Sequence, residues 1–234
     1  MKAIIKREFN AYFNSMLGYV FLTIFLMLTG VMFYLMNIAS TDVSMSNFFL
    51  QVNTWSVFIL PILTMRVFAE DRKLKTEKAL LTAPVSVGEI VFGKFIAVEC
   101  VFMIGVAITL FYPAFINLFG HIPIAETFCC YVGFVLLCSL LISIGMFLSS
   151  TTDSQIIAAL ATYAVLILMF FAGKVYDTAV NPVLVNILAW FSPMERYYDF
   201  THGVMNFKDI FYYISTTALF LFFSGFRLEM RRLR

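Results

Sequence analysis

Six long stretches almost free of charged residues limit what this chain can fold into. The hydrocarbon core of a bilayer is about 30 Å thick, and a helix needs about 20 apolar residues to cross it. Of the 234 residues, 62% are hydrophobic and 13% are charged, whereas soluble domains average about half apolar and about a quarter charged. We therefore predict an all-α integral membrane protein with six transmembrane helices, at 17–39, 43–65, 101–119 (beginning near Ser86), 128–149, 154–173 and 209–226.

The fourth and fifth stretches need a break between them. Asp153 is the only charged residue between Glu126 and Lys174. A continuous helix there would be about 70 Å long at 1.5 Å per residue, more than twice the thickness of the bilayer core. We place the break at 149–153, where Thr152 and Gln155 have the spacing of a helix-starting capping box.

The stretch 178–194 is also free of charge, and a seventh span is an alternative there. Its prolines and asparagines favour short re-entrant or interfacial helices packed against protein. Ser192, Pro193 and Glu195 together predict a helix start, with an N-cap, a proline in the first turn and an acidic residue at the third position. We expect short external helices over 178–205, with one at about 193–205 that presents Pro193, Glu195 and Arg196.

The distribution of Lys and Arg predicts the orientation, because these residues concentrate on the cytoplasmic side of membrane proteins. With six spans and a cytoplasmic N-terminus, 13 of them are cytoplasmic and 3 are external. A seventh span would move the arginines of 227–234 outside, against the rule. We therefore expect both termini in the cytoplasm. The external three are Lys174, Arg196 and Lys208.

Two segments outside the spans are predicted to form helices. In residues 1–16, apolar side chains recur at helical spacing and basic residues occupy much of the remainder, which is typical of an amphipathic helix in the membrane interface. An ordinary flank of the first span is the alternative. In the hydrophilic loop 70–86, a helix over 71–82 would end at Pro84, and Ser86 with Glu89 predicts a capping box that opens the third span. A solvated hairpin is the alternative there.

The sequence offers little support for enzymatic chemistry. Gly88, Gly93 and Lys94 match the start of a phosphate-binding loop, but Phe95 stands where Ser or Thr would hold magnesium, and no strand precedes the motif. His121 and His202 are isolated, and the four cysteines lack zinc-binding spacing. We predict no catalytic, cofactor or metal site in this chain.

Ionisable residues inside a membrane span suggest function by default. Glu99 lies in the third span, with Lys94 and Arg66 as possible partners, and all three are candidates for an intramembrane gate. A structural ion pair that reaches toward the inner surface is the alternative. The absence of Asp, Glu or His along the middle of the spans argues against an ion-coupled secondary transporter or a stand-alone channel.

The loop after the second span carries the most specific resemblance. The chain reads MRVFAEDR at 65–72, KTEKALLTAPVS at 75–86 and EIVFGKF at 89–95, and weaker matches lie at 2–9 and 191–213. Across nearly its whole length the chain resembles the permease subunit of ABC-2 type exporters, particularly the gliding-motility-associated permeases. Lys78 departs from the pattern, since many relatives carry a polar or acidic residue there.

The resemblance implies a mechanism and a set of partners. The helix at 71–82 would be a coupling helix that docks on a separate ABC ATPase, which binds the ATP and Mg. Two permease copies and two ATPases would form the exporter in a bacterial cytoplasmic membrane, with an external accessory protein as a further partner and no nucleic acid. The alternative is a non-transporting subunit that transmits ATPase motion to an external protein. The implied coupling residues are Glu70, Arg72, Lys73, Lys75, Thr76, Glu77 and Leu80.

Overall fold

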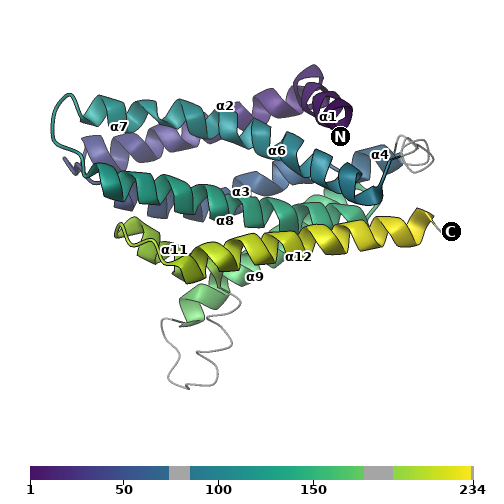
Figure 1. Ribbon diagram of the computed structural model, residues 1–234. Helices are drawn as coiled ribbons and strands as arrows, with labels where there is room; N and C mark the ends of the chain where they lie inside the picture. Colours follow the sequence, from purple (N-terminus) through teal and green to yellow (C-terminus); the bar gives the residue numbers. More distant parts are fainter. Residues whose placement is uncertain (74–84, 177–191, 233–234) are drawn as a thin grey trace.

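The computed structural model describes residues 1–73, 85–176 and 192–232, and these residues form helices and loops without a strand. Six helical segments among them are long and apolar enough to cross a membrane, so the predicted fold class is confirmed (Figure 1). The possible seventh span and the external helices before residue 192 lie largely outside the described residues. The six segments are Met16–Ile38, Ser46–Lys73, Val87–Ile116, Ile124–Thr151, Gln155–Gly173 and Phe207–Arg232.

The helices that make up these segments differ in how continuous they are. The first segment joins α2 (Met16–Phe33) to a π-helical turn, η1 (Tyr34–Ile38), and the second joins α3 (Ser46–Thr64) to the short α4 (Ala69–Lys73). The third joins α6 (Val87–Thr109) to α7 (Phe111–Ile116). The other three are α8 (Ile124–Thr151), α9 (Gln155–Tyr176) and α12 (Phe207–Arg232).

The start of α6 confirms one predicted capping box. The Ser86 hydroxyl accepts the Glu89 N–H at 3.3 Å, and the Glu89 carboxylate accepts the Ser86 N–H at 3.3 Å. The break between α6 and α7 has a covalent cause, because Pro113 has no N–H to give to the Thr109 carbonyl one turn earlier. The Tyr131 hydroxyl of α8 donates to that carbonyl instead, at 2.9 Å.

Two other predicted helix starts need correction. The Thr152–Gln155 capping box is wrong, because α8 runs to Thr151 and α9 begins at Gln155 itself, so Thr152 caps the end of α8. The external helix does begin at Pro193, as α11 (Pro193–Thr201), but the Ser192 side chain makes no capping bond. It also stops at Thr201 rather than near residue 205, and Gly203 follows in the left-handed region, with φ 73°, which favours glycine.

Helix α8 is the central element of the bundle and packs against α3, α6, α9, α11 and α12 (Figure 1). Two glycines allow close approach, as small residues commonly do between membrane helices. A Cβ atom on Gly133 would lie 2.6 Å from the Phe200 ring of α11, and one on Gly145 would clash with the Thr64 side chain of α3. The close packing of α8 therefore depends on glycines, which have no side chain, as well as on apolar side chains.

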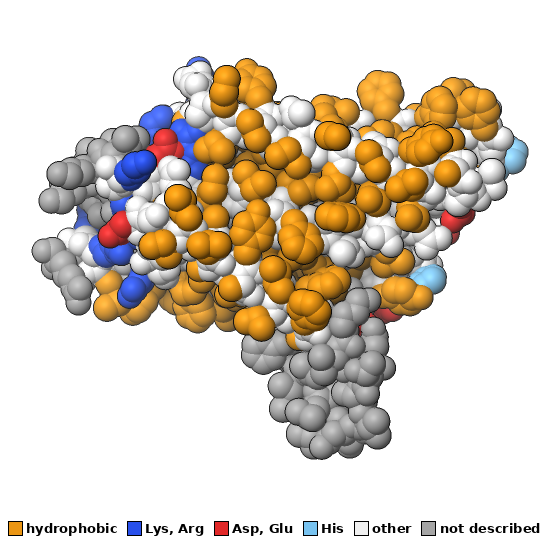
Figure 2. All heavy atoms as spheres, turned by 180° about the vertical axis from the view of Figure 1, so that it is seen from behind, with side chains coloured by type: hydrophobic (Ala, Val, Ile, Leu, Met, Phe, Trp, Pro, Cys, Tyr) orange, Lys and Arg blue, Asp and Glu red, His pale blue; other side chains and the backbone are white. Residues whose placement is uncertain are grey.

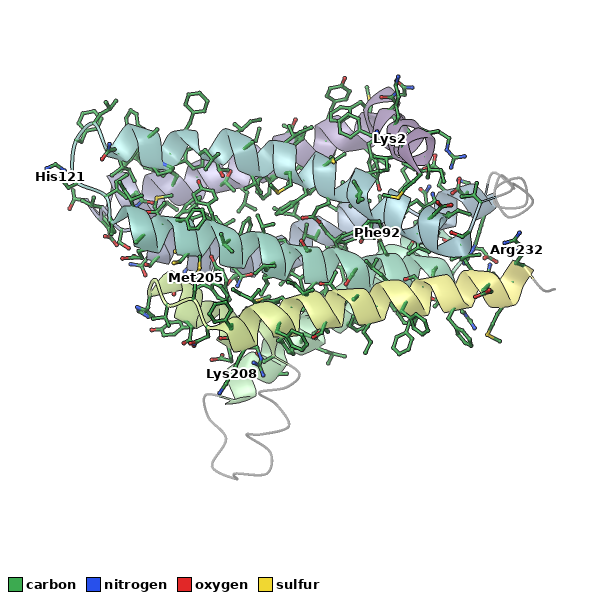
Figure 3. The ribbon with its side chains drawn as sticks, in the orientation of Figure 1. Lys2, Phe92, His121, Met205, Lys208 and Arg232 are labelled. Carbon is green, nitrogen blue, oxygen red and sulfur yellow. The ribbon has the colours of Figure 1, made fainter. Side chains whose placement is uncertain are left out.

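The two ends of the bundle differ in charge. Lys and Arg side chains gather at one end, where both termini lie, and the two histidines of the chain lie at the other (Figures 1 and 2). We call these the basic end and the far end. Exposed apolar side chains cover the surface between them, and Figure 3 shows Lys2 and Arg232 at the basic end and His121 and Met205 at the far end. This belt is what a helical bundle presents to lipid.

Helix α1 (Lys2–Asn14) lies at the basic end, and Ser15 in extended backbone separates it from α2. It packs across α6 and α2. The predicted N-terminal helix is therefore present, two residues shorter than expected at its C-terminal end. Its position in the membrane interface stays a prediction.

Candidate functional site at the basic end

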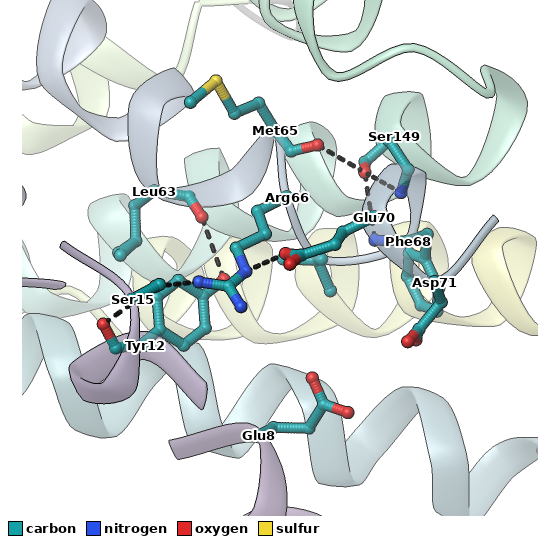
Figure 4. Close-up of polar contacts among 12 residues, drawn as sticks. Glu8, Tyr12, Ser15, Leu63, Met65, Arg66, Phe68, Glu70, Asp71 and Ser149 are labelled. Atoms are coloured by element: carbon teal, nitrogen blue, oxygen red, sulfur yellow. Dashed lines mark hydrogen bonds and ion pairs between the residues drawn. The ribbon is translucent and has the colours of Figure 1, made fainter. Parts of the chain in front are cut away.

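Helix α4 is the element that leads directly into the charged loop 74–84, which lies outside the described residues. One side chain of α8 holds the chain between α3 and α4 in place. The Ser149 hydroxyl accepts the N–H groups of Phe68 and Ala69, both at 3.2 Å, and donates to the Met65 carbonyl at 3.2 Å (Figure 4). It thereby satisfies backbone groups that a helix break leaves without partners.

Lys94 of α6 joins three elements through one buried ammonium group. Its Nζ lies 2.6 Å from an Asp71 carboxylate oxygen, 3.1 Å from a Glu8 carboxylate oxygen and 2.8 Å from the Val67 carbonyl that accepts its hydrogen bond. The Lys94 side chain is 2% exposed. An ammonium group has three donors, and here α1 and α4 supply the two carboxylates. This arrangement ties both helices to α6.

Arg66 makes a second connection between α1 and the α3–α4 segment. Its guanidinium pairs with Glu70, donates to the Ser15 hydroxyl, and lies 5.6 Å from the centre of the Tyr12 ring (Figure 4). The Tyr12 hydroxyl donates to the Leu63 carbonyl at 2.9 Å. Burial raises the pKa of Tyr12, so the hydroxyl keeps the proton that this bond needs.

Arg72 connects α4 to the junction of α8 and α9. Its guanidinium donates to the Thr152 carbonyl at 2.6 Å, to the Ser150 carbonyl, and to the Asp153 carboxylate at 3.3 Å. The Arg72 side chain is 4% exposed. Arg231 of α12 lies 3.6 Å from the same Asp153 carboxylate. Helix α4 is therefore connected directly to the junction of α8 and α9 and, through Asp153, to α12.

A polar cavity of about 240 Å³ lies between α1, α4 and α6. Its lining includes three cations, Arg7, Arg66 and Lys94, and three carboxylates, Glu8, Glu70 and Asp71. A space of this size with these polar groups is large enough to hold water. We call these six residues with Arg72 and Asp153 the α4 network.

The structure brings together part of the predicted coupling set. Glu70 and Arg72 both belong to the α4 network and point into the bundle, and Lys73 is exposed at the end of α4. Lys75, Thr76, Glu77 and Leu80 lie outside the described residues. Contact of Arg72 with a partner protein stays a prediction, and its observed bonds give it an internal role.

The suggested partners of Glu99 are wrong for the described residues. Lys94 pairs with Glu8 and Asp71, and Arg66 pairs with Glu70. The Ser139 hydroxyl of α8 donates to one Glu99 carboxylate oxygen at 2.8 Å. The other oxygen is buried without a hydrogen bond from any described residue. Glu99 is therefore separate from the α4 network.

The external candidates connect α11 to α12 at the far end. The Arg196 guanidinium lies 3.0 Å from an Asp209 carboxylate oxygen and 4.2 Å from the centre of the Tyr212 ring. The Tyr213 hydroxyl donates to the Pro193 carbonyl at 2.6 Å. Glu195 lies close to Gly173 of α9.

The sequence reasoning did not name as site residues four members of the α4 network, Arg7, Glu8, Asp71 and Asp153, or the neighbouring Ser149. Glu8 is four residues from both Ile4 and Tyr12, so it lies on the inward face of α1, where a carboxylate needs a buried cation. That spacing could have identified it. Ser149 and Asp153 were noted only as part of a helix break, and nothing in the sequence pairs them with α4.

The six apolar helices and the buried charge network at one end are those of a multi-pass membrane protein. The chain belongs to the ABC-2 family of transporter proteins, whose model matches residues 3–227. It is thus the permease type of subunit in an ABC transporter, a class whose members work with ABC ATPase partners. A comparison with curated proteins gave no match.

Proposed function

We propose that this chain is the permease subunit of an exporter whose energy comes from a separate ATPase at the basic end, and that the basic end faces the cytoplasm. The gathering of Lys and Arg at that end supports the orientation. The family supports the kind of partner. ATP and Mg would be bound by the ATPase, and two copies of each subunit would form the exporter.

The observation that carries the proposal is the α4 network. Helix α4 is the last described element before the loop 74–84, and Lys94, Arg66 and Arg72 connect its surroundings to α1, α6, α8, α9 and α12. A displacement of the loop by an ATPase would therefore act on helices that cross the membrane. Coupling of this kind needs a contiguous set of contacts that can adopt two arrangements. The cavity of about 240 Å³ beside α4 leaves space for such a change.

The position of Lys94 supports an external energy source. Helix α6 runs through the segment from Gly88 to Lys94, and the Lys94 ammonium is already bonded to Asp71 and Glu8. A phosphate-binding loop instead needs a strand, an open glycine-rich turn and a lysine directed at phosphate.

The test is co-purification of the permease with a candidate ABC ATPase from the same organism. We expect Glu77→Arg, and separately deletion of 74–81, to abolish association while the chain still inserts into the membrane. Lys208→Glu, at the exposed far end, is the matched charge-reversal control and should leave association intact. Stoichiometric ATPase in both loop variants would remove the coupling role.

Reconstitution separates transport from force transmission. We expect liposomes containing both subunits to show ATP-dependent movement of a molecule that co-purifies with the complex. A complex that hydrolyses ATP but moves none of its co-purifying molecules would instead support a subunit that transmits motion to an external protein.

A further inference from the structure

A lateral groove of about 690 Å³ lies between α1 and α6, separate from the polar cavity of the α4 network. Helix α1 lines it with Lys2, Ile5, Lys6 and Phe9, spaced i, i+3, i+4 and i+7. This spacing places all four on one helix face. Figure 3 shows Lys2 on α1 at the basic end.

Helix α6 supplies the other wall with the same spacing, through Cys100, Met103, Ile104 and Ala107. These four residues span about 10 Å along the helix, at 1.5 Å per residue. Because α6 starts at the basic end with Val87, this stripe descends from α1 toward the middle of the apolar belt. The groove is therefore charged at its rim on α1, at the basic end, and apolar along α6 toward the middle of the bundle.

The crossing of α1 over α6 fixes the groove in place. A Cβ atom on Gly93 would lie 3.2 Å from the Ile4 side chain, so the two helices are in close contact there. The next residue, Lys94, pairs with Glu8. The groove opens about two turns of α6 beyond this crossing, where the exposed Cys100 begins the apolar stripe.

The charge of the rim is not neutralised by the described part of the chain. Lys2 and Lys6 are exposed, and neither forms an ion pair with a described residue. Among the described residues no carboxylate lines the groove, whereas three carboxylates line the neighbouring polar cavity. Two cations above an apolar channel are complementary to an amphiphile with an anionic head.

We propose that this groove binds an anionic phospholipid of the bilayer, with its phosphate at Lys2 and Lys6 and an acyl chain along the Cys100–Ala107 stripe. Basic pockets next to membrane helices bind anionic head groups, and lysine stems extend over apolar surface while the ammonium stays at the interface. The bound lipid would hold α1 against α6. Since Glu8 of α1 shares Lys94 with Asp71, the lipid would also stabilise the α1 side of the α4 network.

The experiment uses the intact chain and two readouts. Native mass spectrometry counts phosphatidylglycerol retained in competition with phosphatidylcholine. A bimane label on Cys100, the exposed member of the four cysteines, reports quenching by brominated phosphatidylglycerol or brominated phosphatidylcholine in vesicles. We expect preferential retention of phosphatidylglycerol and stronger quenching by its brominated form, with the preference falling as salt is raised.

Two pairs of variants test the head site and the chain site separately. Lys2→Gln with Lys6→Gln should lower the preference by about fivefold for each lysine, which corresponds to about 1 kcal/mol per basic residue. Lys208→Gln at the far end removes one positive charge and is the control for each single lysine substitution. Ala107→Trp should fill the groove and lower retention with the lysines intact, whereas Ile108→Trp, at a 41% exposed neighbouring position outside the groove, should not.

Three results would overturn the proposal. The first is equal binding of the two lipids by the wild-type chain. The second is an unchanged preference in the double lysine variant. The third is efficient cross-linking of Cys100 to Cys100 of a second chain by a short thiol reagent, together with no quenching of the Cys100 label by either lipid. This combination would show that a second copy of the chain covers the groove.

Discussion

The two ends of the bundle are held together by different chemistry. At the basic end, Lys94, Arg66 and Arg72 join helices through charged contacts, and Lys94 has two carboxylates within reach. At the far end, one ion pair, Arg196–Asp209, joins α11 to α12, and the neutral hydroxyls of Tyr213 and Tyr197 donate to the backbone carbonyls of Pro193 and Cys130. An ammonium with two carboxylates within reach has alternative partners, whereas a hydroxyl on a single carbonyl has one favoured position.

Acidic residues at the far end also bind fixed donors. Glu126 of α8 accepts hydrogen bonds from Ser44, at 2.6 Å, and from Ser46. Burial raises the pKa of Tyr197 in α11, so its hydroxyl stays a donor to the Cys130 carbonyl. We predict from this comparison that the basic end moves and that the far end is a fixed frame, and substitutions at both ends test this prediction.

The largest effect is expected for Lys94→Met. Removing the ammonium leaves Glu8 and Asp71 close together and without their shared cation, and breaking a buried ion pair from one side costs about 3–5 kcal/mol. Thermal unfolding in detergent measures the loss. The triple variant with Glu8→Gln and Asp71→Asn should recover most of it, and a Lys94→Met midpoint no lower than that of Lys208→Met would contradict the role of this lysine.

Arg72→Met should have the second largest effect. The Thr152 and Ser150 carbonyls would lose a charged donor, and leaving buried acceptors unsatisfied costs about 1–3 kcal/mol. We also expect the ATPase to remain associated while its stimulation by the permease falls, because α4 would no longer be tied to α8, α9 and α12. Arg72→Lys should retain part of the stability and part of the stimulation. Normal ATPase stimulation by Arg72→Met would show that coupling does not depend on the contacts of Arg72 with the α8–α9 junction.

The sequence predicted the spans and the capping box of α6 because both depend on local pattern. Charge-free length defines a span, and Ser86 and Glu89 interact within one turn. The α4 network was not predictable in this way. Lys94 pairs with Glu8, 86 positions earlier in the chain, and Arg72 with backbone carbonyls near residue 150, which no side-chain pattern marks. Asp153 was visible as the lone charge in a long apolar region, but its partners come from α4 and α12.

The corrected helix starts have a related cause. Thr152 and Gln155 have the spacing of a capping box, yet α8 continues to Thr151, and the Arg72 guanidinium takes the Thr152 carbonyl. Ser192 also precedes a proper helix start, but its side chain is fully buried beside Gly173 of α9. In both places a tertiary contact displaced a local motif.

Arg196→Met tests the far end with a smaller expected effect. The guanidinium is bonded to Asp209 and lies over Tyr212, and its side chain is 25% exposed, so water compensates part of the loss. We expect a loss of about 1–2 kcal/mol in the same unfolding assay. ATPase stimulation should be unchanged. If this variant reduced stimulation as strongly as Arg72→Met, the far end would be part of the moving machinery and the comparison between the two ends would fail.

Glu99→Gln should have the smallest effect on stability, and it decides between the two interpretations of this residue. The amide oxygen of Gln can still accept the Ser139 hydrogen bond, and the substitution removes a charge from a membrane span, where charge is unfavourable. We expect a change in unfolding free energy below about 1 kcal/mol, with Ser139→Ala costing about 0.5–1.5 kcal/mol. Because Glu99 is separate from the α4 network, ATPase stimulation should also be unchanged. Normal stability with transport lost would identify Glu99 as a gate on the pathway, whereas normal stability with normal transport would leave it a structural partner of α8.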